Sequence, residues 1–124
     1  MLSSSNEQHR TVIEHTQTLR LLKEKTEAFM ATIPLHRSHA ANMKVVETLG
    51  QYVAEAEALQ NMVQQAMITT CKVDAMRTYA SLEQSTFQFI KETAQVQSFY
   101  TVAAEAFLER TVRQQPHVEG SSLH

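Results

Sequence analysis

The sequence VVETLGQYVAEAEALQNMVQQAMITT, residues 45–70, decides the fold class. Apolar residues recur in it every three or four positions, as on one face of an α-helix, and Ala, Gln, Glu, Leu and Met, which propagate helices well, fill much of the rest. The apolar stripe consists of Val45, Leu49, Tyr52, Ala56, Leu59, Val63, Ala66 and Thr70, and Val46, Val53 and Met67 widen it. A stripe of this width exceeds the seam of a two-stranded coiled coil, so we expect this helix to contact at least two neighbours.

The composition of the whole chain agrees with an all-α fold. The 124 residues include only two glycines and two prolines, far fewer than an average protein has. Strands need frequent reversals built on Gly, Asn or Asp, so a fold with sheets is excluded. A chain with few turns has few, long elements, and this length suits a single domain.

A second stripe precedes this helix and predicts another. It consists of Val12, His15, Leu19, Leu22, Thr26, Phe29 and Ile33. Pro34 should end the helix, because the residue before a proline is disfavoured in α conformation. Ser4 with Glu7, or Ser5 with Gln8, could form a capping box at its start. We therefore expect a short N-terminal tail, residues 1–4, and a first helix over residues 5–32.

Two more helices are predicted after Pro34. Ser38 is suited to be the N-cap of a helix over residues 39–69, and Asp74 that of a helix over residues 74–113. The stripe of the last helix consists of Tyr79, Leu82, Thr86, Phe89, Ile90, Thr93, Val96, Tyr100, Ala103 and Phe107. Pro116 follows its end, and residues 114–124 have no periodicity, so we expect a flexible C-terminal tail there.

The boundary near Cys71 leaves two alternatives. Residues 68–73 are rich in β-branched side chains, which favour helices less, but no Gly or Pro enforces a turn. One continuous helix over residues 39–113 is the alternative to a hairpin. We favour the hairpin, because the continuous helix would leave much of its apolar stripe without an intramolecular partner. The prediction is an elongated up-down-up bundle over residues 5–113, with coiled-coil-like packing at about +20°.

Gly50 lies inside the middle helix, where glycine costs about 1 kcal/mol relative to alanine. Either it is simply tolerated, or it permits a close approach between helices.

Residues that could catalyse a reaction or bind a metal are few, and their spacing matches no known motif. No Glu is followed by His three residues later, as the di-iron helical bundles require, and His-Glu-x-x-His is absent. Two glycines cannot supply a phosphate-binding loop. His36 and His39 share a spacing suited to one helical face, but we interpret them as solvated histidines. We therefore expect no enzymatic activity, no cofactor and no metal site.

Charge and cysteine content exclude several partner classes. The net charge of -2 and the lack of a basic stripe argue against nucleic acid. No apolar run approaches the ~18 residues of a membrane helix, so we expect no membrane insertion. Residues 1–5 lack the features of a signal peptide. A lone cysteine, Cys71, cannot form an intramolecular disulfide and suits a reducing compartment, cytoplasmic or otherwise intracellular.

Several residues predict contacts with other proteins. Residues 58–71 and 93–104 carry no charge, and depletion of charge is typical of interface cores. The candidate partner surface consists of Phe99, Val102, Ala106, Met62 and Gln65, and the first three lie opposite the main stripe of their helix. His15 lies within an apolar stripe and is a candidate pH-sensitive core residue.

These features lead to one main functional hypothesis. The chain is expected to be a structural or adaptor subunit that joins a larger helical assembly, with itself or with a partner protein. The alternatives are a small chaperone that holds a client helix in a groove between helices, and a helical carrier of a small apolar ligand.

Overall fold

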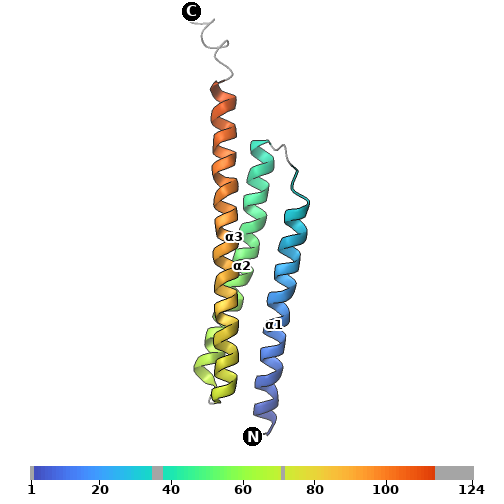
Figure 1. Ribbon diagram of the computed structural model, residues 1–124, viewed down its shortest axis with the longest axis vertical. Coiled ribbons are helices and arrows are strands. Elements are labelled where there is room, and N and C mark those ends of the chain that lie inside the picture. The colour runs from blue at the N-terminus through green and yellow to red at the C-terminus, as the bar shows by residue number, and fades with distance from the viewer. Residues whose placement is uncertain (1, 35–37, 71, 114–124) are drawn as a thin grey trace, which may run out of the picture.

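A computed structural model describes residues 2–34, 38–70 and 72–113, and all regular structure in these ranges is helical. The helices are α1 (Leu2–Ala31), α2 (His39–Thr69) and α3 (Val73–Arg113). They form an elongated up-down-up bundle in which α1 and α3 run in the same direction, and α3 extends beyond the other two (Figure 1). The predicted three-helix fold is confirmed, and the continuous helix over residues 39–113 is excluded.

Both ends of α2 lie where the sequence predicts them. Ser38 is the N-cap: its backbone is extended, and its hydroxyl accepts a hydrogen bond of 3.0 Å from the backbone N–H of Ala41. At the other end Thr70 leaves helical conformation, and its N–H donates to the carbonyl of Ala66 at 3.0 Å. The reversal near Cys71 therefore needs neither Gly nor Pro; Cys71 itself lies outside the described residues.

The other boundaries differ slightly from those predicted. The first helix begins at Leu2 rather than Ser5, so Ser4 and Ser5 lie inside it, because no Gly or Pro near the N-terminus interrupts the helix. The third helix begins at Val73, and its first helical bond runs from the N–H of Met76 to the carbonyl of Lys72. Asp74 is therefore not the N-cap. It lies in the first turn, where its negative charge interacts favourably with the positive end of the helix dipole.

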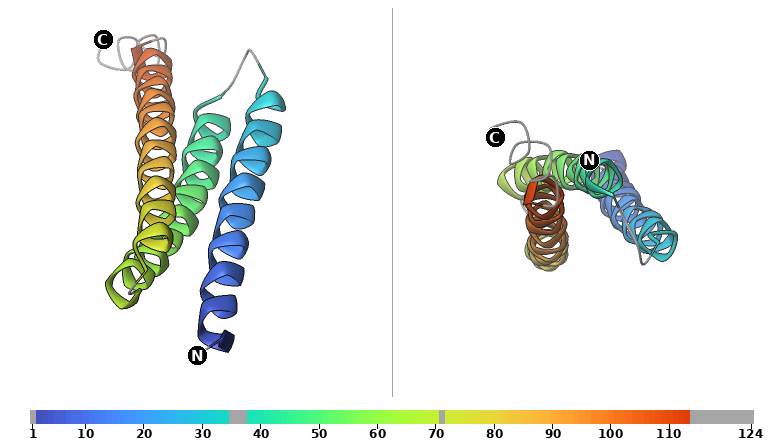
Figure 2. Two further views of the ribbon diagram at one scale, coloured as in Figure 1. Left: turned by 60° about the horizontal axis from the view of Figure 1, so that its bottom comes forward. Right: turned by 90° about the horizontal axis from the view of Figure 1, so that it is seen from above.

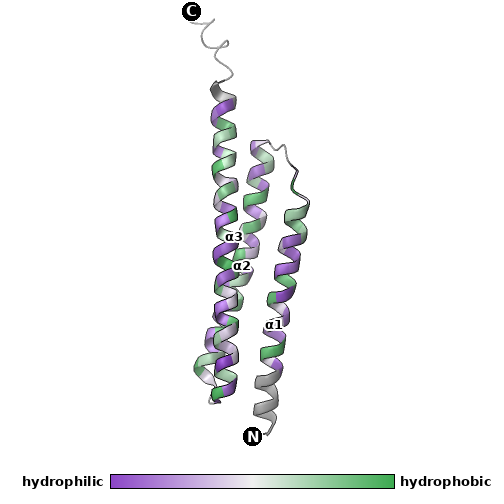
Figure 3. Cartoon of the chain, viewed as in Figure 1, coloured by the Kyte–Doolittle hydropathy of each residue, from purple (hydrophilic) through white to green (hydrophobic). Residues whose placement is uncertain are grey.

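The core forms where the three predicted stripes meet. Hydrophobic and hydrophilic residues alternate along each helix, as expected for helices with one buried face (Figure 3). Its buried members are Leu19, Leu22, Ala56, Leu59, Val63, Tyr79, Leu82 and Phe89, with Val12, Tyr52, Ala66, Met67 and Ile90 packed against them. Threonines also lie in the core. The hydroxyls of Thr26 and Thr86 donate to the carbonyls four residues earlier, each at 2.8 Å, so their burial leaves no unpaired hydroxyl.

The helices do not pack equally closely. α2 and α3 form a long antiparallel hairpin, whereas α1 lies further from both along part of its length (Figure 2). Of the α1 side chains that the structure describes, only Leu19, Leu22 and Thr26 are buried. None of the three helices, as far as they are described, is long and apolar enough to cross a membrane.

Candidate helix-binding surfaces

Phe99, Val102 and Ala106 form one apolar surface on the solvent side of α3, which we name the outer patch. The exposed fraction is 61% for Phe99 and 64% for Val102, and Ala106 is also exposed. The Phe99 ring packs edge-on against Tyr100, with 5.2 Å between centroids and an interplanar angle of 86°. This contact restricts the Phe99 ring, so the patch has a defined shape.

Met62 and Gln65 lie on a different part of the molecule. Hydrogen bonds between His39 and Ala104 and between Gln97 and Val46 show that the outer patch lies at the level of the first turns of α2 along the bundle, although it faces solvent. Met62 is 49% exposed and lies sixteen residues after Val46, about 24 Å further along the helix axis. The five candidate residues therefore do not form one surface.

The two histidines considered above have different surroundings. His15 is half-buried on α1, and its pH-sensitive role stays a prediction. The Nδ1 atom of His39 lies 2.9 Å from the carbonyl oxygen of Ala104. A carbonyl only accepts, so Nδ1 carries the hydrogen and donates it. The interpretation of His39 as solvated is wrong, because this half-buried ring joins the start of α2 to α3; His36 lies outside the described residues.

The α1–α2 side has contacts that sequence spacing did not predict, beside a hollow of about 540 Å³ lined by Leu21, Lys25 and Glu55 among others. The Nζ atom of Lys25 lies 3.2 Å from a carboxylate oxygen of Glu55 and 5.3 Å from the centre of the Tyr52 ring. Phe29 packs edge-on against the same ring, with 6.0 Å between centroids. The ion pair is half-exposed, so most of the stabilisation here comes from the aromatic packing.

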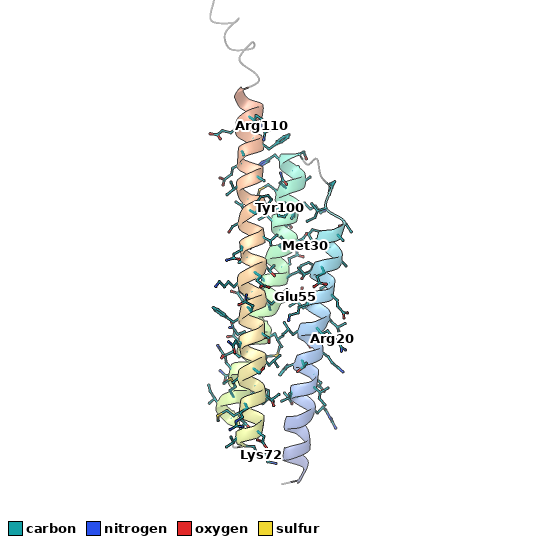
Figure 4. All side chains as sticks on the ribbon, in the orientation of Figure 1. Arg20, Met30, Glu55, Lys72, Tyr100 and Arg110 are labelled. Atoms are coloured by element: carbon teal, nitrogen blue, oxygen red, sulfur yellow. The ribbon has the colours of Figure 1, made fainter. Side chains whose placement is uncertain are left out.

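The α1–α3 side is open and forms what we name the α1–α3 groove. It consists of three adjoining hollows of about 550, 370 and 320 Å³, and Lys23 lines all of them. Its far end lies at Met30, which Figure 4 shows on α1. Sequence patterns did not predict this groove, because its lining combines helices that are distant in the chain.

α3 continues past the outer patch without a covering helix. Residues 105–113 follow Ala104, which lies beside the first residue of α2, and Figure 4 shows Arg110 on this extension. Leu108 on the extension is 48% exposed. Nine residues separate Leu108 from Phe99, so the two side chains lie on opposite sides of α3, and the end of this helix exposes apolar side chains on more than one side.

Metal-ligating and titratable side chains were also considered among the described residues. Within the part of the chain that the structure describes, no three His, Cys, Asp or Glu residues are grouped to hold a metal ion. Burial raises the pKa of the Tyr79 phenol, which is a feature of the core rather than of a cleft. Comparison of the sequence with protein-family models, curated proteins and solved structures finds no match.

Proposed function

We propose that this chain is a non-enzymatic structural or adaptor subunit that associates through helix–helix contacts in a larger helical assembly. The observation that carries the proposal is the outer patch. Adjoining apolar side chains on a helix surface are energetically unfavourable in water and often mark protein contacts. The absence of charge from residues 93–104 lowers the desolvation cost of covering that surface.

The kind of partner and the compartment belong to the same proposal. A net charge of -2 favours a protein partner, or a second copy, over nucleic acid. The single cysteine in the sequence favours a reducing compartment, cytoplasmic or otherwise intracellular.

The experiment compares two phenylalanines on α3. Phe99 and Phe87 are similarly exposed, at 61% and 57%, but only Phe99 belongs to the outer patch. The solution mass of the wild-type chain is measured by light scattering, and a photo-reactive residue is placed at position 99 or 87 in the source cells. We expect an oligomer that Phe99→Glu dissociates, or a cross-linked partner that forms from position 99 and not from 87.

The controls separate association from folding. Phe87→Glu should leave the solution mass and the cross-linked partner unchanged, and both variants should retain the helical circular dichroism signal. A monomer that gives no specific cross-link from position 99 would contradict the proposal.

A further inference from the structure

The lining of the α1–α3 groove has the periodicity of a helix-binding surface. The α1 residues that line it are Thr16, Leu19, Arg20, Lys23, Thr26, Glu27 and Met30, spaced by three and four. Buried Leu19, Leu82 and Phe89 form an apolar floor. The α1 lining spans fifteen residues, from Thr16 to Met30, about 21 Å or four helical turns.

Charges are distributed unequally along the groove. Arg20 and Arg77, together with Lys23, line the hollow that lies nearer the N-terminal ends of α1 and α3. Glu27 and Glu92 line the next hollow, toward the C-terminal ends. All five side chains are exposed, so they can contact a molecule that lies in the groove.

The direction of α1 and α3 sets the direction of a helix between them. Both run the same way, so a helix antiparallel to both would complete an up-down-up-down four-helix bundle. Its C-terminus, which carries partial negative charge, would lie near Arg20 and Arg77, and its positive N-terminus near Glu27 and Glu92. Topology and charge therefore favour the same orientation.

We propose that the α1–α3 groove binds an amphipathic helix of a partner protein, about four turns long and antiparallel to α1 and α3. Apolar residues of this helix lie above the buried side chains Leu19, Leu82 and Phe89 and contact the more accessible lining residues Met30 and Val96. Basic residues in its first turn lie beside Glu27 and Glu92, and acidic residues in its last turn lie beside Arg20 and Arg77.

A second copy of the chain fits the groove less well. Each helix already uses its main apolar stripe in the shared core. Two of the three outer-patch residues, Phe99 and Val102, lie within residues 93–104, which carry no charge to match either end of the groove. The occupant is therefore a different protein.

The test uses two stapled helical peptides, since stapling equalises their helicity. Both carry one leucine stripe; the matched peptide has Lys in its first turn and Glu in its last, and the reversed peptide exchanges them. We expect the matched peptide to bind about tenfold more tightly, since a few exposed ion pairs with the charged groove residues together provide that difference. A spin label at its N-terminus should broaden the amide signals of Glu92 and Thr93 more than those of Arg77 and Thr78.

Charge-reversed proteins provide the control. The variant R20E/R77E/E27K/E92K should prefer the reversed peptide, whereas K44E/E47K, which exchanges two exposed charges on α2 outside the groove, should behave as wild type. Equal affinity for both peptides, or broadening near Arg77 instead, would overturn the inference.

The inference rests on the proposed function only in that both assign helix–helix contacts to the chain. Their failures are distinguishable: peptide signals at Phe99 and Val102 alone would reject the groove and retain the outer patch. Loss of the effect of Phe99→Glu would reject the patch and leave the groove result unaffected.

Discussion

The side-chain amide of Gln97 donates a hydrogen bond of 3.2 Å to the backbone carbonyl of Val46, across the interface between α3 and α2. It does so by lying over Gly50: a Cβ atom at position 50 would be 2.9 Å from the Gln97 nitrogen. The atoms nearest to this Cβ belong to the end of the Gln97 side chain and not to the backbone of α3, so the contact at Gly50 is one between a glycine and a flexible side chain.

Gly50→Ala should have two opposing effects on the free energy of unfolding: a gain in helix propensity and, where Gln97 is present, the loss of its hydrogen bond. Alanine favours the helix by about 1 kcal/mol, but its Cβ displaces the Gln97 amide, whose hydrogen bond contributes about as much. We expect little net change in the free energy of unfolding in the wild type, and stabilisation by about 1 kcal/mol in a Gln97→Ala background. Urea denaturation of the four proteins measures this, and an equal effect in both backgrounds would show that the two positions are not coupled.

The docking of α1 should depend on apolar burial rather than on its ion pair. Leu22 is buried in the core cluster, so Leu22→Ala should lower the free energy of unfolding by about 2–5 kcal/mol. Lys25 and Glu55 are half-exposed, so Lys25→Ala should cost under about 1 kcal/mol. Hydrogen exchange should show faster exchange in α1 than in α2 and α3 for Leu22→Ala; a larger effect from Lys25→Ala would be the opposite result.

At Thr86, substitution by valine should lower the free energy of unfolding less than substitution by serine. Its hydroxyl is fully buried and bonds only within the same helix, to the carbonyl of Leu82, which also accepts the usual helical bond. Removing the hydroxyl while keeping the shape should change stability by less than about 1 kcal/mol. Thr86→Ser keeps the hydroxyl but removes a buried methyl group, at a cost of about 1 kcal/mol. Thermal unfolding of both variants should give the lower midpoint for serine.

Much of the fold was predictable because it depends on local patterns. A period of three and four residues specifies one buried face, and residues such as Leu49, Leu59 and Tyr79 are buried where that period predicts. The N-cap at Ser38 was also predictable, since a hydroxyl before an apolar run satisfies helix donors locally. The reversal between α2 and α3 was predicted from the β-branched residues 68–73 and from the need of the apolar stripe for an intramolecular partner.

Other features depend on how the helices lie relative to one another. Buried Asn42 and Ala104 lie near the start of α2, where the His39 contact joins α2 to α3, and no stripe included them. The α1–α3 groove depends on the distance of α1 from α3, which no local spacing encodes. For the same reason Met62 and the outer patch could be predicted as exposed, but not as separate surfaces.

Stability should fall in alkaline solution because of Tyr79. Burial raises the pKa of this phenol above its usual value of 10.0. Above pH 10 the unfolded chain therefore loses the phenol proton while the folded chain keeps it, so the unfolded state gains stability. The contribution of Tyr79 is fully present below pH 10 and is lost as pH rises toward the folded-state pKa. In urea denaturation at a series of pH values, Tyr79→Phe should lose stability less steeply between pH 9 and 11 than the wild type. Parallel curves for the two proteins would show that the phenol does not titrate differently in the folded and unfolded states.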